Sequence, residues 1–510
     1  MTEYSGVMMN QDRTPLIDAM AAFINRNPAF FRVPGHRFER GVDEKALALI
    51  GSRAFQADLT EAEGLDDLHH PAGAILESER LAAELYGSDR CWFLVNGTTS
   101  GNEAMILSAV GPGEKILISR DAHRSALQGL VLSGAVPVWI TPPEIPGWNL
   151  TGSVDPEKIR EALDRDSSIR AVYLTSPTYY GVRSDIRTTA EICHEHGVPL
   201  LIDEAHGAHL YFDSRMYAPK GAISCGADLA AQSTHKTCGS MTGSSMLHLK
   251  GKLISPERVD ACVKLVTTTS PNYVMMASLD GARHRMAMKG QECFRRAYRL
   301  RQKAAAMLED IPGVSVLYFR SDAGMYGLDP LRLVFSAREA GIRGYDLQRM
   351  LYDEGNVSCE LSDPDHVVCV ITSGNTDEEI EALAETCRKA VETYGRQSTD
   401  KTDGTEKPWA PADLSAPEEQ QMKNFLLRPM PELKMTPREA FYSRTETVSL
   451  ADAVGRVAAE SFIPYPPGIP VICPGEVLSH ETAEEIITFS SLEMNGQKAD
   501  RKDSFRVVVS

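Results

Sequence analysis

The side chain with the clearest capacity for covalent chemistry in this sequence is the amine of Lys236. It lies in the run Ser-Thr-His-Lys-Thr (233–237), which follows an apolar β-like segment and precedes a Gly/Ser-rich stretch. A lysine at a strand end beside small polar groups can be held away from water, which favours the neutral amine that forms imines. Because a lysine in such a place is more often simply solvated, this interpretation depends on its neighbours.

Asp203 is an acid at the end of an almost wholly apolar strand, in the run VPLLIDEAHGAHLYF. A charge there is costly unless it has a cationic partner, and the protonated ring nitrogen of pyridoxal phosphate is one such partner. The acid could equally cap the next element, pair with an arginine, or bind a metal together with Glu204, His206 and His209. No further ligand at a defined spacing accompanies them, so the sequence predicts no metal site.

Two further segments are of the kind that binds anions or rings. The turn NGTTSGN (96–102) follows the segment CWFLV and precedes a helical stretch, so the backbone of Gly97 and the hydroxyls of Thr98 and Thr99 could enclose a phosphate. Its spacing differs from that of a P-loop, because no Gly-Lys-Ser/Thr follows. His123, in SRDAHRSALQG, could stack on a cofactor ring, transfer a proton or cap the next helix. Together with the lysine and the acid above, these residues form a consistent set for binding pyridoxal phosphate.

The elements that position these residues alternate between strands and helices. Six short apolar segments are predicted to be strands: 91–95, 115–119, 136–140, 171–175, 198–203 and 228–233. Several lack polar alternation, as expected for a mostly parallel sheet that helices cover on both faces. The sequence therefore predicts an α/β layered domain with its ligands at the carboxyl ends of the strands.

The length of 510 residues predicts more than one domain. A second α/β region opens with a long basic helix and is followed by a stretch rich in charge, Ser, Thr and Pro that is typical of a linker. We expect an N-terminal segment that contributes to the active site and the dimer, a large cofactor-binding domain, a small α/β domain, a linker and a C-terminal domain. Their predicted ranges are 1–75, 76–285, 286–395, 396–420 and 421–510.

Composition limits the partners and the compartment. Lys and Arg number 53 and Asp and Glu number 70, a formal net charge of −17 that argues against nucleic acid or an anionic membrane as partner. No apolar run approaches the ~20 residues needed to span a bilayer, and the N-terminus lacks a secretory signal pattern. The ten cysteines are scattered without a CxxC pair, which predicts a reducing, cytoplasmic location without disulfides or zinc.

The residues of these motifs and their order along the chain resemble those of the fold-type I enzymes that use pyridoxal phosphate, and specifically those of the bacterial Orn/Lys/Arg decarboxylase family. The resemblance spans nearly the whole chain and rests on PGHR (34–37), LDDLHHPAGAI (65–75), NGTTSGN (96–102), DAHRS (121–125), DEAHGAH (203–209), STHKT (233–237), TSPNYVMMASLD (269–280) and PYPPGIPVICPGE (464–476). The last motif discriminates best, because aminotransferases of this fold have no such C-terminal module. The resemblance implies an aspartate-aminotransferase-like large domain with a mostly parallel sheet, a small α/β domain and an extra C-terminal α+β domain.

By that resemblance, Lys236 carries the cofactor, Asp203 pairs with the pyridinium nitrogen and His123 stacks on the ring. The residues implied to hold the phosphate or to lie against the cofactor are Gly97, Thr98, Thr99, Ala205, His206, Ser233 and His235, with Ser270 reaching the phosphate of a neighbouring subunit. The active site would therefore be shared within a homodimer or a larger assembly. Two departures from the family pattern are Cys238-Gly239 in place of Leu-Pro and Asn272 in place of a frequent Ser.

The implied reaction is the decarboxylation of a basic amino acid to an amine that can serve as a polyamine precursor, with Lys236 or His206 returning a proton to Cα. A cationic substrate side chain would need carboxylates in the pocket, and the candidates are Glu476, Glu360, Asp66 and Asp67. The compact length resembles the shorter subgroup often labelled arginine decarboxylase, which favours arginine over lysine and ornithine.

Two other functions are compatible with the fold. An aminotransferase or aldolase acting on amino acids would share the cofactor, but the C-terminal module speaks against it. A non-catalytic regulator that binds polyamines would be expected to have lost Lys236 or Asp203, and both are present.

Overall fold

The computed structural model describes residues 9–215, 221–395, 430–464, 470–491, 493–494, 497–498 and 503–509. The chain divides into two compact units, and each combines two stretches of sequence: residues 1–109 with 197–292, and residues 110–196 with 293–510. The predicted linker at 396–420 lies outside the described residues. The predicted boundary at 285/286 falls inside helix α11 (Tyr273–Glu309), which continues from the first unit into the second.

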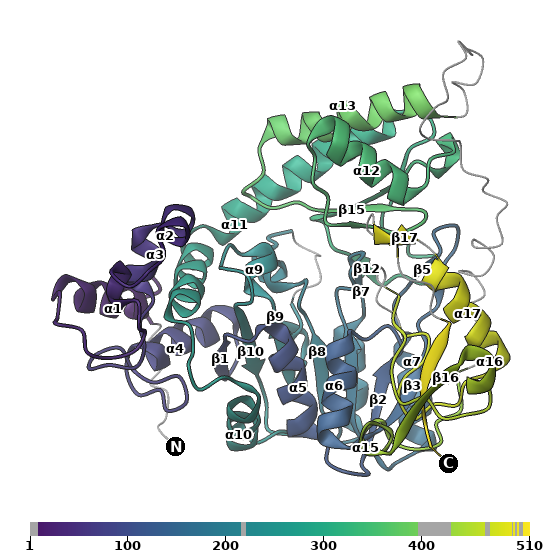
Figure 1. The fold of residues 1–510 in the computed structure, drawn as a ribbon, viewed down its shortest axis with the longest axis horizontal. Coiled ribbons are helices and arrows are strands. Elements are labelled where there is room, and N and C mark those ends of the chain that lie inside the picture. Colours follow the sequence, from purple (N-terminus) through teal and green to yellow (C-terminus); the bar gives the residue numbers. More distant parts are fainter. Residues whose placement is uncertain are drawn as a thin grey trace. The chain divides into compact units, whose positions relative to one another are not determined.

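Four strands of the first unit pair in the order β1 (Arg90–Leu94), β10 (Ser245–Leu249), β9 (Leu229–Gln232) and β8 (Leu200–Asp203). β8 and β9 are parallel, whereas β10 is antiparallel to both β9 and β1 (Figure 1). Consequently β1, β8 and β9 run in the same direction, and their carboxyl ends share one edge. β10 is not among the predicted strands, because its Gly/Ser-rich approach is typical of irregular backbone.

Helices cover these strands. α5 (Gly97–Ala109) packs on β9, on β10 and on α10 (Pro256–Val266), while α4 (Ala74–Tyr86) packs on β1 and on α1 (Pro15–Asn25). α4 ends at Gly87, whose φ of +73° is the left-handed conformation that glycine adopts without strain. The shorter helices of this unit are η1 (Arg37–Glu39), α2 (Glu44–Ile50), α3 (Ser52–Ala57), η2 (Ala208–Phe212), η3 (Ile223–Cys225) and α9 (Thr234–Thr237).

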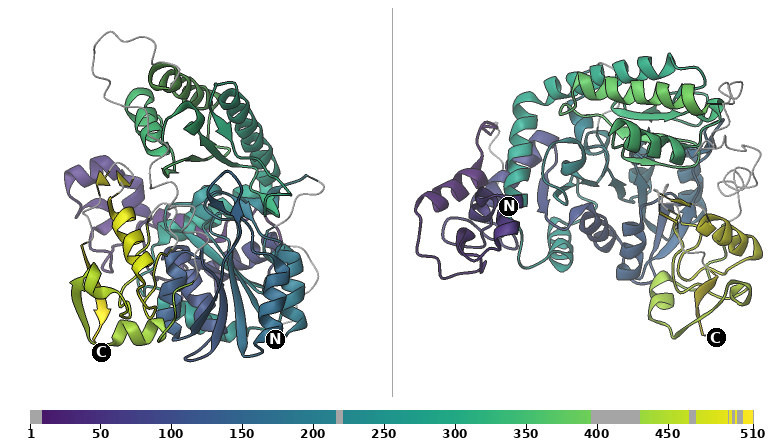
Figure 2. Two further views of the ribbon diagram at one scale, coloured as in Figure 1. Left: turned by 90° about the vertical axis from the view of Figure 1, so that its right-hand side faces the viewer. Right: turned by 45° about the horizontal axis from the view of Figure 1, so that its top comes forward.

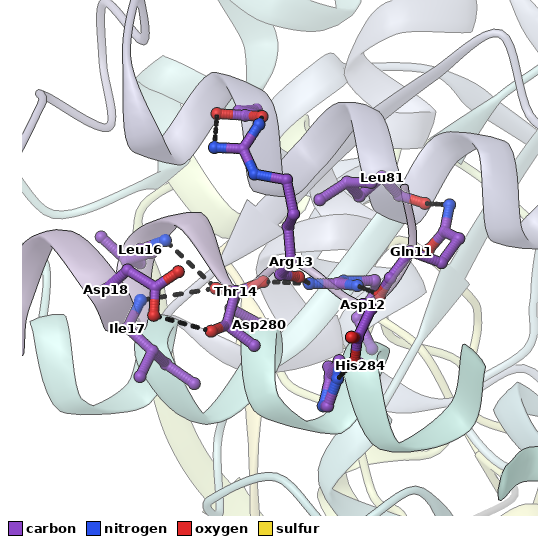
Figure 3. Close-up of polar contacts among 12 residues, drawn as sticks. Gln11, Asp12, Arg13, Thr14, Leu16, Ile17, Asp18, Leu81, Asp280 and His284 are labelled. Atoms are coloured by element: carbon purple, nitrogen blue, oxygen red, sulfur yellow. Dashed lines mark hydrogen bonds and ion pairs between the residues drawn. The ribbon is translucent and has the colours of Figure 1, made fainter. Parts of the chain in front are cut away.

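Buried hydrogen bonds and an ion pair connect α1, in the N-terminal segment, to α11 (Figure 3). Asp280 Oδ2 accepts hydrogen bonds from the backbone N–H groups of Leu16 and Ile17, at 3.1 and 3.4 Å, in the first turn of α1. Asp280 Oδ1 lies 2.7 Å from the guanidinium of Arg283, and both side chains are fully buried. Because each buried charge neutralises the other, this pair holds α1 in one position on α11.

Three parallel strands of the second unit pair in the order β6 (Ile169–Thr175), β2 (Lys115–Ser119) and β3 (Val136–Ile140). β2 and β3 have the predicted bounds, and β6 begins two residues before its predicted start. The helices that alternate with these strands are α6 (Arg124–Ser133), α7 (Pro156–Arg165) and α8 (Ile186–Glu195), and a hairpin of β4 (Glu144–Ile145) and β5 (Leu150–Thr151) follows β3.

The second unit also contains a small antiparallel sheet in the order β11 (Ser315–Val316), β13 (Arg332–Ser336), β15 (Val367–Val370) and β14 (Leu361–Ser362). The end of α11, α12 (Gly344–Gly355) and α13 (Asp377–Tyr394) share an apolar core with this sheet, which includes Leu300, Leu347 and Leu383. These elements can be followed in both views of Figure 2. β12 (Gly327–Leu328) pairs with β7 (Val182–Arg183), and η4 (Arg338–Ala340) precedes α12.

The C-terminal residues form a module with its own apolar core, in which Ile472, Ile486 and Phe505 are fully buried. β16 (Thr445–Ser449) pairs with β19 (Ser504–Val508), and β17 (Glu493–Met494) pairs with β18 (Gln497–Lys498). The helices of this module are α15 (Pro437–Tyr442), α16 (Leu450–Ala453) and α17 (His480–Ser491). In the described part of the chain, no helix has both the length and the apolar character that crossing a membrane requires.

Candidate functional site

Lys236 lies in the single helical turn α9, directly after β9, and its amine faces a histidine from the turn that follows β8. Its Nζ is 2.8 Å from Nε2 of His206, which is 5% exposed. At this distance one nitrogen donates and the other accepts, so a proton is shared by two groups that can each gain or lose one. The structure therefore brings together two of the four residues predicted to be catalytic.

Asp203 is the last residue of β8 and is 2% exposed. Its Oδ2 accepts a hydrogen bond from Asn102 Nδ2 at 2.8 Å, and its Oδ1 accepts one from the Ala205 N–H at 3.0 Å. Both donors are neutral, so these two hydrogen bonds orient the carboxylate without neutralising its negative charge. Asn102 is not among the predicted site residues, although it ends the NGTTSGN motif and its polar side chain precedes an apolar helical run.

A cluster of buried hydroxyls lies at the start of α5. Thr98 Oγ1 is 2.6 Å from Ser233 Oγ and 2.5 Å from Ser245 Oγ. Gly97 begins the helix with a φ of +73°, which glycine tolerates and which turns the chain from β1 into α5. Hydroxyls at a helix N-terminus suit a phosphate, because the backbone N–H groups and the helix dipole both favour an anion there. Ser245 is not among the predicted site residues, because it lies on β10, which the sequence pattern does not predict.

The remaining residues predicted for the phosphate site are His235 in α9, Thr99 in α5 and Ser270 in the segment before α11. His235 Nδ1 is 2.8 Å from the Ser244 carbonyl oxygen, so this nitrogen carries the proton. Thr99 and Ser270 are exposed, and the Ser270 N–H donates to Thr268 Oγ1 at 3.2 Å.

His123 belongs to the second unit and caps the N-terminus of α6. Its Nδ1 accepts from the Ser125 N–H at 3.2 Å and lies 2.8 Å from Ser125 Oγ. Since a backbone N–H can only donate, Nδ1 is unprotonated and the ring proton is on Nε2. The helix-capping role that the sequence analysis left open is present.

The contacts of Glu476 do not match its predicted role, which is to bind the cationic side chain of the substrate. It is fully buried, its Oε1 lies 2.5 Å from Arg120 Nη1, and its Oε2 lies 3.0 Å from Arg120 Nη2. Oε2 also accepts from the Cys473 N–H at 2.8 Å. The charge of Glu476 is already neutralised inside the protein, which argues against its holding a substrate cation.

The contacts of Asp66 also do not match its predicted role, because its carboxylate accepts hydrogen bonds from backbone N–H groups. Its oxygens accept from the N–H groups of Ala72, Gly73 and Ile75, at 2.9, 2.8 and 3.0 Å, where α4 begins. Asp67 accepts from the His69 N–H at 2.8 Å within the same loop.

Glu360 is the candidate acid whose side chain is exposed. The hydroxyl of Tyr179 donates to its Oε1 at 2.5 Å, which orients the carboxylate and leaves Oε2 for another partner. Among the described residues, no group of three or more His, Cys, Asp or Glu side chains is arranged to hold a metal ion.

Comparisons with known proteins agree with this architecture. The family models described as Orn/Lys/Arg decarboxylase, major domain, and Orn/Lys/Arg decarboxylase, C-terminal domain, match residues 14–379 and 419–499. The chain is 34% identical to an arginine decarboxylase of Halalkalibacterium halodurans, covering 98% of this chain and 99% of that protein. It is 35% identical to an arginine decarboxylase of Bacillus subtilis, covering 94% of each.

Lysine decarboxylases are more distant. The constitutive lysine decarboxylase of Escherichia coli is 24% identical, over 94% of this chain and 78% of that protein. Among solved structures, the lysine decarboxylase LdcF of Francisella novicida has a TM-score of 0.81 at 21% identity, covering 97% of this chain and 81% of that chain. This likeness confirms the predicted fold class, including the additional C-terminal domain.

Proposed function

Because the chain belongs to the Orn/Lys/Arg decarboxylase family, we propose that it removes the α-carboxyl group of a basic amino acid, with arginine as the preferred substrate. Arginine is favoured because the two relatives of similar length that carry the name arginine decarboxylase are 34% and 35% identical, whereas the lysine decarboxylase of E. coli is 24% identical. Lysine and ornithine are the alternative substrates. The products are CO2 and the corresponding amine, which fits the supply of a polyamine precursor.

We expect pyridoxal phosphate as the cofactor, because the first unit offers a group for each of its parts. The Lys236 amine suits the aldehyde carbon, the buried Asp203 carboxylate suits the ring nitrogen, and the Thr98 hydroxyl at the start of α5 suits the phosphate. When bound, this cofactor supplies a ring that takes up the electron pair left by departing CO2. By family resemblance we add as cofactor-binding residues Gly97, Thr99, His123, Ala205, His206, Ser233, His235 and Ser270.

The 2.8 Å contact between Lys236 Nζ and His206 Nε2 is the single observation that carries the proposal. Lys236 must lose a proton before its nitrogen can bond to carbon, and His206 is placed to accept that proton. Replacing the carboxyl group by hydrogen consumes one proton at Cα. We assign its delivery to Lys236 Nζ, with His206 Nε2 restoring the proton to the amine.

We assign the binding of the substrate's cationic side chain to Glu360, in preference to the other three predicted acids. Its carboxylate is exposed and pre-oriented by Tyr179, whereas Glu476 is neutralised by Arg120 and Asp66 caps α4. A guanidinium prefers a fixed, planar partner, and an oriented carboxylate provides one.

We further propose that the protein acts as a homodimer or a larger homo-oligomer in the cytoplasm. Support for an assembly comes from apolar side chains of the N-terminal segment, since Phe31, Val33 and Leu49 are 89%, 69% and 87% exposed in the single chain. Support for a reducing compartment comes from the ten cysteines, all of which are free thiols. Light scattering of the purified protein measures the assembly.

The test offers arginine, lysine and ornithine separately to the purified protein with pyridoxal phosphate and measures CO2 together with the amine. We expect stoichiometric CO2 and amine, with the highest kcat/KM for arginine. Borohydride reduction followed by peptide mass spectrometry should place the cofactor on Lys236, and Lys236→Ala should abolish both the label and the activity. Amino-group transfer to a keto acid without CO2 would refute the proposal.

A further inference from the structure

Glu204 is a buried acid directly after Asp203, and the proposed reaction gives it no part. It is 1% exposed. Its Oε2 accepts a hydrogen bond from Gln232 Nε2 at 2.7 Å and another from the Tyr211 hydroxyl at 3.1 Å. Its Oε1 accepts one from the Ala222 N–H at 2.7 Å. One carboxylate therefore joins three different segments of the first unit.

The turn that carries His206 begins at Glu204. The Glu204 N–H donates to the Ala231 carbonyl at 3.0 Å, which continues the bonding between the two chain segments beyond the end of β8. The Gly207 N–H donates to the Glu204 carbonyl at 2.9 Å and closes a four-residue turn with His206 at its third position. The Tyr211 hydroxyl then returns from η2 to the Glu204 side chain. The chain on both sides of His206 is thus bonded to Glu204.

Tyr211 is itself held in place. The Ile223 N–H donates to its hydroxyl oxygen at 3.0 Å, so the hydroxyl proton can be given to Glu204. Burial raises the pKa of Tyr211, and the nearby charge of Glu204 raises it further, so the hydroxyl keeps this proton. The Tyr211 ring meets the Tyr86 ring edge to face, with centroids 4.8 Å apart. Tyr211 therefore fixes the end of the turn to Glu204.

The end of β9 is held to the same carboxylate through Gln232. This glutamine is the last residue of β9, is fully buried and lies four residues before Lys236. The helical turn α9 starts two residues after it, and the Lys236 N–H donates to the Ser233 carbonyl at 3.1 Å. Glu204 is thus bonded both to the segment that presents His206 and to the segment that presents Lys236.

We propose that Glu204 is a positioning residue, which sets the distance between the Lys236 amine and the His206 ring. This inference rests on the proposed function, in which these two groups exchange a proton. Its physical basis is that the two oxygens of a carboxylate can accept all three hydrogen bonds. An amide in its place has one accepting oxygen and an NH2 group, so at least one buried donor faces another donor. The turn and the end of β9 must then shift against each other.

The experiment measures kcat and KM of the holoenzyme for the amino acid that the wild type decarboxylates fastest, in Glu204→Gln, His206→Asn and the double variant. We expect Glu204→Gln to lower kcat by roughly tenfold to hundredfold, because a misplacement of about 1 Å is enough to slow a reaction on that scale. The KM should stay within about twofold of the wild type. In the His206→Asn background, Glu204→Gln should lower kcat further by no more than about twofold, because it acts through His206.

Asp228→Asn is the matched control. Asp228 is a buried acid that joins the same two strands at the opposite edge of the sheet, where its Oδ2 accepts from the Leu200 N–H at 2.8 Å. It directly precedes β9, and Leu200 is the first residue of β8. We expect Asp228→Asn to lower the Tm, as Glu204→Gln does, while its kcat stays within about twofold of the wild type.

Three outcomes would overturn the inference: a wild-type kcat in Glu204→Gln, an undiminished effect of this change in the His206→Asn background, or an equal loss of kcat in Asp228→Asn. If far-UV circular dichroism shows that Glu204→Gln does not fold, Tyr211→Phe provides the same cycle. It removes one of the three donors and should lower kcat by about threefold. If the wild type releases no CO2 and carries no borohydride-reducible cofactor on Lys236, the proposed function itself has failed, whereas an active wild type with additive variants defeats the inference alone.

Discussion

Lys236 Nζ and His206 Nε2 lie 2.8 Å apart although their residues are 30 positions apart in the sequence. The contact exists because β8 and β9 are parallel neighbours, so the turns that follow them leave the sheet at the same edge. The amine that is expected to bond to the cofactor thus has a proton acceptor and donor within hydrogen-bond reach.

We expect His206→Asn to slow amine formation by roughly 10²- to 10⁴-fold while Lys236 still binds the cofactor, because the proton partner of the amine is lost. Rapid-quench measurement of CO2 tests the rate, and borohydride labelling tests the retention of the cofactor. His196→Asn is the matched control, since that ring pairs with Asp164 at 2.9 Å on a helix surface. A labelled variant with the wild-type rate would remove His206 from the mechanism.

Asn102→Ala should weaken the binding of pyridoxal phosphate, because Asp203 loses one of the donors that orient its carboxylate. Hydrogen bonds to charged groups are worth about 1.5–3 kcal/mol, which corresponds to a roughly tenfold to hundredfold higher Kd. Equilibrium dialysis measures the Kd directly. Ser108→Ala, on the same helix, removes a hydroxyl that donates to the Ala104 carbonyl and bonds the Cys262 thiol, and it should leave the Kd unchanged. Equal losses in both variants would point to a general loosening of α5.

Glu360→Gln is expected to raise the KM for arginine by roughly tenfold with little change in kcat, because it removes the charge to which we assign the binding of the substrate side chain, away from the reacting bond. The control is Glu354→Gln, which alters a similar exposed pair, since the Tyr394 hydroxyl donates to Glu354 at 3.1 Å. Steady-state kinetics with arginine and lysine measure both constants. An unchanged KM for both substrates would move the cation site to another residue.

Glu79 is a buried acid on α4 whose stability effect depends on pH. Burial raises the pKa of Glu79 to about 8, and the hydrogen bond from the Phe93 N–H at 2.9 Å offsets this only in part. Between pH 4.5, the ordinary pKa of a glutamate, and about pH 8, the folded state keeps a proton that the unfolded state has lost. The free energy of unfolding therefore falls as pH rises through this window, by up to about 5 kcal/mol.

Glu79→Gln cannot ionise and should escape this loss. Its Tm relative to the wild type should rise steadily from pH 5 to pH 8, by several degrees in total. Thermal unfolding followed by circular dichroism at four or five pH values measures this trend, with the exposed Glu161→Gln as control. A difference in Tm that does not depend on pH would show that Glu79 is already ionised in the folded protein.

Residue type and local pattern were sufficient for several parts of the fold and the site. Runs of apolar residues predict β2 and β3 with their observed bounds, because a buried parallel strand is apolar along its whole length. The placement of Asp203 at the end of an apolar strand is likewise legible from the sequence, since local composition decides where such a strand ends.

Which side chains from distant segments contact each other was determined by the tertiary structure alone. The sequence singles out Glu476 as a free acid, but the fold brings Arg120 to it across 356 positions and neutralises its charge. The Gly/Ser-rich residues before β10 give no local signal for a strand, and β10 is stabilised by its hydrogen bonds to β1 and β9. Ser245, which is hydrogen-bonded to Thr98, is therefore also not predicted. A local pattern records the preferences of one segment, whereas a buried charge or hydroxyl takes its role from whichever group the fold places against it.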